Sequence, residues 1–401
     1  MADQNSSNFD AALKDYFSDD MVRDLGYEDN PLHAMLEKKE DFMGRRYVQP
    51  VQYGRPQGRS ADSAAALANK TPAEYEDFNV TMAADYASLS ITRKVMKESR
   101  GDRGAFLRAK IREVESMLKT LTQSAAHAEY RNASGARGRI SATVSPTTTV
   151  TLMEPEDIVH FEVGQTLVFA DNETSGAVHA LTRTVTAVDE SAGTFTVNST
   201  LAATAVGTSD WIFIEGDRSA KISGLLSWFP TTAPTAGDSH FGVDRSVHVS
   251  RLAGSRLSVT NVPIAEGIRR GLALLGRGGS YPTHCFMGHQ KYRDLELELE
   301  NKVVYVDSNV TKTIGFTGIK LTTGKKPITV YADHNCPDAN AFLLTLEYLK
   351  LVSMDPVPDM FDDDGITMLR EVGNWGFEIR ADYFANLIPE ETKSHCVLTL
   401  E

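Results

Sequence analysis

Cysteine is scarce in this sequence of 401 residues, in which three cysteines stand far apart at Cys285, Cys336 and Cys396. No Cys-x-x-Cys pair occurs, so neither a disulfide framework nor a zinc site of paired cysteines is indicated, and a reducing compartment is expected. Long hydrophobic runs are also missing, because no stretch approaches the roughly 18 apolar residues of a membrane-spanning helix. The start of the chain is polar and acidic, unlike a secretory signal. We therefore expect a soluble protein that stays in the compartment where it is made, with no membrane partner.

Positive charge is in deficit as well. Lys and Arg number 41 against 54 Asp and Glu, which gives a formal net charge of -13. Such a surface repels phosphate, so tight, general binding of nucleic acid is disfavoured. The densest basic run, at 93–112, is diluted by Glu98 and Asp102. We interpret it as a solvated helix face, and the alternative is a contact with acidic surfaces of neighbouring subunits.

Local motifs for catalysis or cofactor binding are not found. The run 318–326 resembles a phosphate-binding loop, but five residues separate its glycines where four are needed, and Lys326 replaces the magnesium-binding hydroxyl. The run 362–371 resembles part of a calcium loop, but Met360 stands in the place of the first aspartate ligand. A third group lacks the acidic partner and spacing of a zinc enzyme: His284, Cys285 and His289. We therefore predict no cofactor, no metal, no catalytic residue and no enzymatic activity, with an enzyme of scattered catalytic groups as an alternative.

Length and composition indicate a folded chain of several lobes. A mass of 44.0 kDa exceeds that of one ordinary domain. Hydrophobic residues at 41% and charged residues at 24% are close to the averages of globular proteins. The order of helical and strand patterns predicts an α+β fold.

The N-terminal part, 1–45, is predicted to be a helical arm. One short amphipathic helix is expected at 9–17. A second is expected to begin with Asn30 as N-cap and Pro31 in the first turn, and to end at Gly44.

A long hairpin is predicted at 46–97. Two extended runs, 46–53 and 78–92, flank a polar stretch of small residues at 55–75 that has almost nothing to bury. Within 78–92 the alternating apolar residues shift from even-numbered to odd-numbered positions, which predicts a bulge or bend in the strand. Because two strands with a polar tip bury too little area to be stable alone, we expect the hairpin to lie on another subunit. The alternative is a simple surface loop.

A long helix is predicted at 104–130, within a segment assigned as 98–142. Its apolar residues are spaced three and four apart and form one stripe: Leu107, Ile111, Val114, Leu118, Leu121, Ala125 and Ala128. Gly135 is expected to supply a left-handed cap. Coiled-coil pairing is the weaker alternative, because the pattern covers fewer than four heptads.

Three further segments complete the chain. A small all-β module is predicted at 143–216, and a mixed lobe is predicted at 217–371. The last segment, 372–401, is predicted to hold paired terminal strands that return to the long helix. The module is expected to hold strands at 150–152, 159–163, 166–169, 181–188, 194–197 and 211–214. The mixed lobe is expected to hold helices at 263–275 and 289–300 and strands at 284–287, 328–331 and 341–346. The end of the chain is expected to hold strands at 375–384 and 396–400.

In this order of parts, the sequence resembles the major capsid protein family of tailed bacteriophages, whose shell fold is shared with encapsulins and the herpesvirus capsid floor. The local cues are Asn30-Pro31-Leu32, the run 44–50 that enters the hairpin, Ser223-Gly224-Leu225-Leu226-Ser227-Trp228, and Arg380-Ala381-Asp382. The resemblance implies an N-arm, an E-loop hairpin, a P-domain with a spine helix and terminal strands, and an A-domain, with the β-module as an insertion.

The resemblance also implies the function of a structural shell protein. Such a chain assembles with itself through pentamers and hexamers into an icosahedral capsid that encloses double-stranded DNA without sequence-specific binding. It implies a place in the virion, assembly in the host bacterial cytoplasm, and scaffolding, portal and decoration proteins as partners. An encapsulin-type compartment shell is the alternative within this fold.

We predict inter-subunit contacts from the basic residues of the hairpin and of the lead-in to the spine helix. The candidates are Arg55, Arg59, Lys70, Arg93, Lys97, Arg100 and Arg103. Lys70 near the tip invites comparison with relatives that cross-link covalently, but no motif identifies a partner.

Overall fold

The computed structural model describes residues 30–40, 42–92, 103–141, 147–201, 206–299, 318–321, 326–361, 369–370 and 376–400, except the side chains of residues 92 and 103–112. The predicted helix at 9–17 and most of the calcium-like run lie outside these residues. The described part combines helices with several sheets, which confirms the α+β prediction. None of its helices has the length and apolar character needed to cross a membrane.

The arm is shorter in helix than predicted. The helix α2 (Pro31–Met35) begins as expected with Asn30 before it and Pro31 in its first turn. Its predicted end at Gly44 is wrong, because the chain becomes extended at Leu36 and forms β1 (Glu37–Lys39). The reason is long-range pairing: β1 lies parallel to β18 (Leu349–Ser353), a partner more than 300 residues away.

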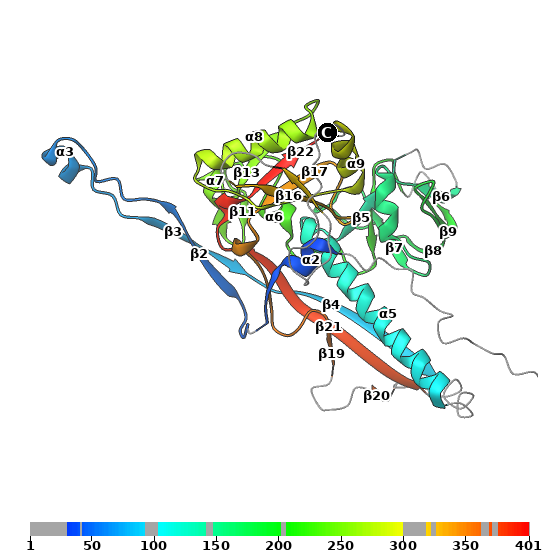
Figure 1. Ribbon diagram of the computed structural model, residues 1–401. Coiled ribbons are helices and arrows are strands. Elements are labelled where there is room, and N and C mark those ends of the chain that lie inside the picture. Colours follow the sequence, from blue (N-terminus) through cyan, green and yellow to red (C-terminus); the bar gives the residue numbers. More distant parts are fainter. Residues whose placement is uncertain are drawn as a thin grey trace, which may run out of the picture.

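The hairpin consists of β2 (Tyr47–Gly54) and β3 (Glu74–Val80), which pair antiparallel, with the short helix α3 (Ser63–Ala68) at its tip. It projects well away from the rest of the molecule (Figure 1). The predicted break in the second run is present, since β3 ends at Val80 and β4 (Ala83–Thr92) begins a new sheet. There, β4 pairs along its whole length with β21 (Gly376–Pro389). The parity change therefore marks the point where the chain leaves the hairpin and enters the spine sheet.

The spine consists of one long helix on one long sheet. The helix α5 (Arg103–Tyr130) has 28 residues, or about 42 Å, and confirms the predicted helix. It runs beside β4 and β21 (Figure 1). In the described part of its predicted stripe, Leu121, Ala125 and Ala128 are buried. The spine sheet joins β1, β4, β18 and β21 with two short strands, β19 (Asp359–Met360) and β20 (Leu369–Arg370).

Gly135 has the predicted left-handed backbone, with φ +78°, but it does not cap the helix. The helix ends five residues earlier, at Tyr130. A Cβ atom on Gly135 would lie 2.3 Å from the carbonyl oxygen of Asp217, so glycine is required because two backbone segments pass very close together.

The β-module is a six-stranded sheet in the order β5-β10-β7-β8-β9-β6. Its strands are β5 (Ala136–Arg139), β6 (Thr147–Thr151), β7 (Thr166–Ala170), β8 (Thr182–Asp189), β9 (Thr194–Leu201) and β10 (Trp211–Ile214). Two predictions need correction. The sheet includes β5, before the expected start at 143, and the expected strand at 159–163 is replaced by the 3-10 helix η2 (Pro155–His160). The three-residue period of η2 places Ile158 and Phe161 together in the module core, where Phe161 stacks on Phe195.

The mixed lobe contains a six-stranded sheet in the order β13-β22-β17-β14-β16-β15, covered by two helices. These are β13 (Ser255–Ser258), β14 (His284–Met287), β15 (Ile319–Leu321), β16 (Ile328–Ala332), β17 (Asn340–Leu344), β22 (Cys396–Thr399), α8 (Ile264–Arg277) and α9 (His289–Leu299). Shorter elements are α6 (Leu225–Trp228), β11 (Ser239–His240), β12 (Val243–Asp244), α7 (Val249–Leu252), η3 (Leu346–Tyr348) and η4 (Thr392–Ser394). The predicted helices and strands of this lobe are confirmed, to within a few residues at their ends.

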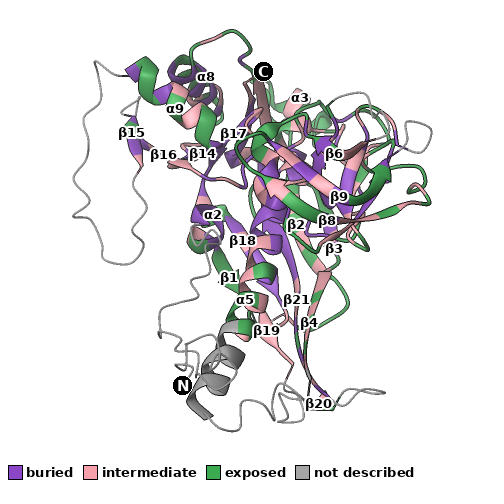
Figure 2. Cartoon of the chain, turned by 90° about the vertical axis from the view of Figure 1, so that its right-hand side faces the viewer, coloured by how far each residue is buried: buried purple, intermediate pink, exposed green. Residues whose placement is uncertain are grey.

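The terminal strands differ from the prediction that they pair and return together to the spine. β21 lies in the spine sheet, but β22 pairs with β13 and β17 in the mixed lobe. The apolar run at 396–400 indicates a buried strand, but it contains no signal that selects one sheet over the other. Buried residues gather inside the mixed lobe and along its junction with α5, while the outward faces of the β-module strands are exposed (Figure 2).

Candidate subunit-contact surface

The tip of the hairpin, residues 55–73, is exposed over most of its length and contains the short helix α3. None of its residues is buried. Asp62 caps α3, since its carboxylate accepts hydrogen bonds from the backbone N–H groups of Ala64 and Ala65, both at 3.3 Å. The N–H of Gln57 donates to Thr71 Oγ1 at 2.9 Å and closes the base of the tip. The tip is therefore ordered by its own hydrogen bonds without any hydrophobic core.

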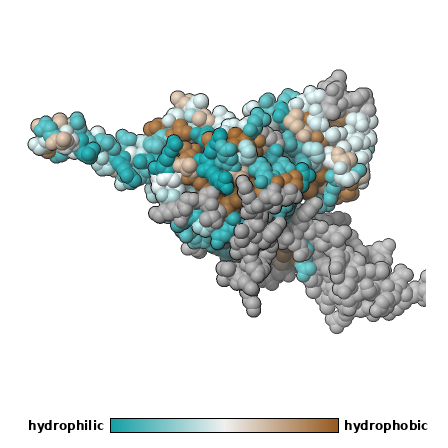
Figure 3. Space-filling view, turned by 45° about the horizontal axis from the view of Figure 1, so that its top comes forward, coloured by the Kyte–Doolittle hydropathy of each residue, from teal (hydrophilic) through white to brown (hydrophobic). Residues whose placement is uncertain are grey.

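The tip is basic, and the strand that leads away from it is acidic. Arg55, Arg59 and Lys70 are all exposed on the tip. Glu74, Glu76 and Asp77 follow along β3 and are exposed as well. The surface of the hairpin is accordingly hydrophilic over most of the side seen in Figure 3. A basic tip beside an acidic outer stem suits electrostatic contact with other surfaces.

Apolar side chains are also exposed on the hairpin. Val48 is 50% exposed and Tyr75 is 62% exposed, and the tip adds Leu67 at 62%. The register places Val48, Pro50 and Tyr75 on the same outer face, because Val48 pairs with Asn79, Pro50 with Asp77 and Gln52 with Tyr75. This outer face has apolar area that the described part of the chain does not cover.

The base of the hairpin is rooted in its own chain. Phe78 is fully buried and packs edge to face on Trp228, with ring centroids 5.1 Å apart. Val80 is buried beside it, and Arg251 Nη1 donates to the carbonyl oxygen of Tyr53 at 2.6 Å. The prediction that the hairpin lies on another subunit can therefore apply only to the tip and the outer stem.

A buried polar cluster lies where the chain enters the spine sheet from the hairpin. The carboxylate of Asp85, on β4, accepts hydrogen bonds from Ser124 Oγ at 2.7 Å and from Tyr383 OH at 3.2 Å. Lys221 Nζ lies 2.5 Å from the same carboxylate. Burial, and then the charge of Asp85, raise the pKa of Tyr383 well above its usual value, so the phenol stays protonated as a donor. One carboxylate thus joins β4, α5, β21 and the segment after β10.

The cluster continues into the β-module. Lys221 Nζ also lies 3.1 Å from Asp217, and Arg137 of β5 lies 3.6 Å from Asp217. Burial raises the pKa of Asp217, and the charges of Lys221 and Arg137 oppose that shift. Two partly buried carboxylates and two buried cations therefore balance one another, and together they connect the module to the spine. Sequence reasoning missed this cluster, because its charged members alone are spread over 136 residues and Tyr383 lies 298 residues from Asp85.

Two histidines form a second link between the spine helix and the module. The rings of His127, on α5, and His160, on η2, meet edge to face at 4.3 Å. Burial is the main cause that lowers both pKa values well below the usual range. Both imidazoles are therefore neutral at neutral pH, which suits a packing contact between the two parts.

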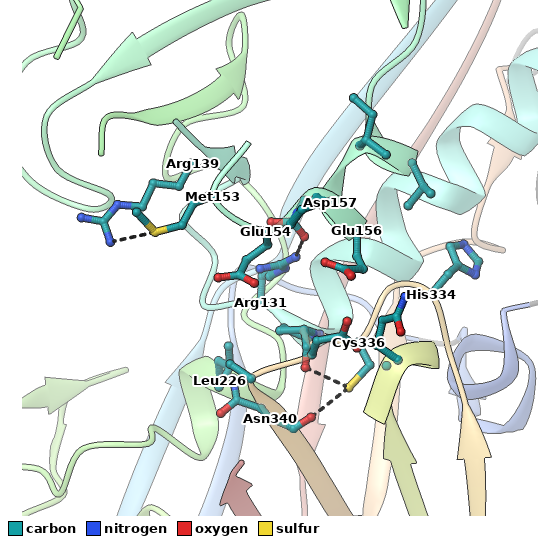
Figure 4. Close-up of a pocket in the computed structure, with 18 of the residues that line it drawn as sticks. Arg131, Arg139, Met153, Glu154, Glu156, Asp157, Leu226, His334, Cys336 and Asn340 are labelled. Atoms are coloured by element: carbon teal, nitrogen blue, oxygen red, sulfur yellow. Dashed lines mark hydrogen bonds and ion pairs between the residues drawn. The ribbon is translucent and has the colours of Figure 1, made fainter. Parts of the chain in front are cut away.

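A cleft of about 750 Å³ lies between the β-module and the mixed lobe. Arg131 and Asp157 form an ion pair of 2.8 Å in it, and Glu154 and Glu156 stand nearby (Figure 4). Cys336 Sγ lies against the backbone carbonyl oxygens of Pro337 and Asn340, and burial raises its thiol pKa well above the usual value. The thiol is thus not activated as a nucleophile.

The predicted contact residues fall into two groups. Arg55, Arg59 and Lys70 lie together on the hairpin tip. Arg93, Lys97 and Arg100 lie outside the described residues, and Arg103 opens α5 with a side chain that is not described. In the group of His284, Cys285 and His289, the cysteine is fully buried and packs in the hydrophobic core of the mixed lobe.

Comparisons with known proteins find structures of similar fold but no related sequence. No known family matches the chain, and no curated protein matches it. Among solved structures, a chain of the cyanophage A-1(L) capsid asymmetric unit matches with a TM-score of 0.61 and 13% identity over 99% of both chains. The capsid of a native GTA particle matches with a TM-score of 0.50 and 9% identity over 100% of this chain and 99% of that one. An encapsulin from Synechococcus elongatus is less similar, with a TM-score of 0.46 and 7% identity over 100% of this chain and 96% of that one. The chain therefore has the fold of phage major capsid proteins.

Proposed function

We propose that this chain is the major capsid protein of a tailed bacteriophage, which assembles with itself through pentamers and hexamers into an icosahedral shell around double-stranded DNA. The observation that carries the proposal is the match of the whole chain to capsid proteins along their whole length. The projecting hairpin supports it, because a free tip and an exposed apolar outer face are suited to covering a neighbouring copy.

The parts of the chain take the following roles in this proposal. The arm is 1–45, the E-loop is 46–97 with its last strand β4 in the spine sheet, and the P-domain is built on 98–142 and 372–401. At the domain edges, β5 pairs into the β-module, β22 pairs into the mixed lobe, and β18, β19 and β20 pair into the spine sheet. The A-domain is 217–371, and the β-module at 143–216 is an insertion that stabilises the capsomer. The protein acts as a structural component without enzymatic activity, is assembled in the host bacterial cytoplasm, and meets scaffolding, portal and decoration proteins there.

Electron microscopy of the expressed full-length chain tests the proposal. We expect closed particles, together with pentamers or hexamers at low concentration, because closed symmetry adds many weak contacts into a stable container. A chain that stays monomeric at all concentrations would contradict the proposal. Shells that contain a specific protein cargo would instead identify a compartment shell of the encapsulin type.

We expect the three basic residues of the tip to contribute to assembly. In the triple variant Arg55→Glu, Arg59→Glu and Lys70→Glu, the yield of shells should fall severalfold, since like charges then face the acidic surfaces that the tip meets. The loss should be largest at low salt, because screening weakens the interaction of exposed charges. Sedimentation at two salt concentrations measures this, with the neutral variant Gln57→Ala as control. An unchanged yield at low salt would remove the tip charges from the interface.

A further inference from the structure

Three side chains of the β-module gather at one end of its sheet: Asp171, His179 and Asp210. Their nearest ligand atoms all lie within 4.8 Å of one another. His179 Nε2 lies 2.9 Å from Asp210 Oδ2 and 3.3 Å from Asp171 Oδ1. The imidazole nitrogen therefore faces two carboxylates at once.

The fold brings these residues together through strand register. Trp211 of β10 pairs with Ala170 of β7 in the antiparallel ladder, so Asp210 and Asp171 stand at the next position of the two strands. The backbone N–H of His179 donates to the carbonyl oxygen of Phe169 at 2.8 Å, which folds the connection after β7 back over its own strand. The residues are thus fixed by the sheet, although the sequence separates them by up to 39 positions.

The connection that carries Asp171 and His179 is held from outside by one arginine. Arg218 donates to the carbonyl oxygens of Asn172, Ser175 and Gly176, at 2.9, 2.5 and 3.0 Å. Its guanidinium also lies over the ring of Phe213. The N–H groups of Arg218 are used in hydrogen bonds to the backbone of the connection. These bonds hold the connection in place, with the side chains of Asp171 and His179 next to Asp210.

The two spacings from the imidazole nitrogen suit a metal ion, and the third, between the two carboxylates, is within 4.8 Å. Ligands about 2.1 Å from a metal lie about 3.0 Å apart at a right angle and about 3.4 Å apart at a tetrahedral angle. The distances of 2.9 and 3.3 Å from the imidazole nitrogen to the two carboxylates fall at these values. One imidazole with two carboxylates is a donor set for divalent first-row transition metals, and two negative charges offset the charge of such an ion.

The three side chains differ in burial, and this difference would let an ion reach them from solvent. The side chain of Asp210 is only 6% exposed, and its carboxylate also accepts a hydrogen bond from the N–H of Gly207 at 2.7 Å. That of Asp171 is 73% exposed, which leaves one side of the group open to an ion and its water ligands. Arg139 donates to the carbonyl oxygen of Ser209 and lies over the ring of Trp211, and neither of these contacts involves the three side chains.

We propose that Asp171, His179 and Asp210 form a binding site for a divalent transition-metal ion such as Zn²⁺ or Mn²⁺. The ion joins the connection after β7 to the start of β10 and stabilises this end of the β-module. For binding, Nε2 of His179 acts as the ligand and the ring proton resides on Nδ1. This site is independent of the proposed capsid role, because its donors all come from one chain.

Metal titration of the full-length, metal-stripped chain tests the site. Isothermal titration with ZnCl₂, and separately with MnCl₂, should show one ion bound per chain at this site, while CaCl₂ should bind far more weakly. Asp171→Asn and His179→Ala should each lower the affinity roughly tenfold or more. Saturating Zn²⁺ should raise the unfolding temperature of the unmodified chain by a few degrees and leave both variants unchanged.

Two controls keep the test decisive. His289→Ala removes an exposed histidine elsewhere and should bind metal as the unmodified chain does. Asp171→Asn preserves the shape of an exposed side chain, so its unfolding temperature without metal should match that of the unmodified chain. If the unmodified chain binds neither metal, the three residues form only a hydrogen-bonded cluster and the proposal is overturned. Binding that neither variant weakens would overturn it as well, since the ion would then sit elsewhere.

Discussion

Replacing residues 55–73 by an Asn-Gly turn should give a chain that folds normally and no longer forms closed shells. The register allows this change, because Gly54 and Glu74 are the last residues paired at the open end of β2 and β3, and Asn-Gly favours a tight hairpin turn. The tip has no buried residue, so its removal takes nothing from the core. What is lost is the area that the tip would cover on a neighbour, at roughly 25 cal/mol for each apolar Å².

Two measurements separate assembly from folding in this experiment. Thermal unfolding of the shortened chain should lie within a degree or two of the unmodified chain, because the buried contacts of Phe78 and Val80 at the hairpin base remain. Electron microscopy and analytical ultracentrifugation should show capsomers or monomers in place of shells. The variant Gln57→Ala keeps the full tip and should assemble normally. Closed particles of ordinary size from the shortened chain would show that the tip is not an assembly element.

The parts of the fold that follow from local patterns were predictable. The spine helix has a sustained stripe at helical spacing, and the polar stretch between two extended runs indicated a projecting hairpin. The errors concern pairing between distant segments. The arm helix ends early because β1 finds a partner at β18, and β22 joins the mixed lobe because β13 and β17 leave a place between them. Nothing within these short segments encodes their distant partners.

The same distinction applies to the polar sites. Arg55, Arg59 and Lys70 were accessible to sequence reasoning, because they lie in one short stretch of exposed composition. The pair Asp85 and Lys221 was not, since a lone acid in one strand and a lone lysine 136 residues later give no local signal. Only the folded arrangement of β4, α5 and the segment after β10 shows that these charges are buried together.

Lys221→Met should destabilise the chain by about 3 kcal/mol, because it removes a buried cation that faces two partly buried carboxylates. Lys221 lies 2.5 Å from Asp85 and 3.1 Å from Asp217, and the side chains of these three residues are 6%, 14% and 15% exposed in that order. Without the lysine, Arg137 at 3.6 Å from Asp217 is the remaining cation of the cluster. Urea unfolding followed by linear extrapolation measures the change in free energy.

An exposed ion pair elsewhere in the chain serves as a control, because it has the charge pairing of the cluster without its burial. Arg270 and Glu266 form an ion pair on the surface of α8, with both side chains about half exposed, so Arg270→Met should cost less than about 1 kcal/mol. Adding Asp85→Asn to Lys221→Met should recover part of the lost stability, because one unpaired carboxylate is then neutral. If Lys221→Met costs no more than Arg270→Met, the cluster does not fix the module on the spine. Suppose instead that Lys221→Met costs several kcal/mol and Asp85→Asn restores part of that loss. The cluster then couples three parts energetically: the start of β4, the spine helix and the inserted module. The hairpin tip is in that case held by a rigid base.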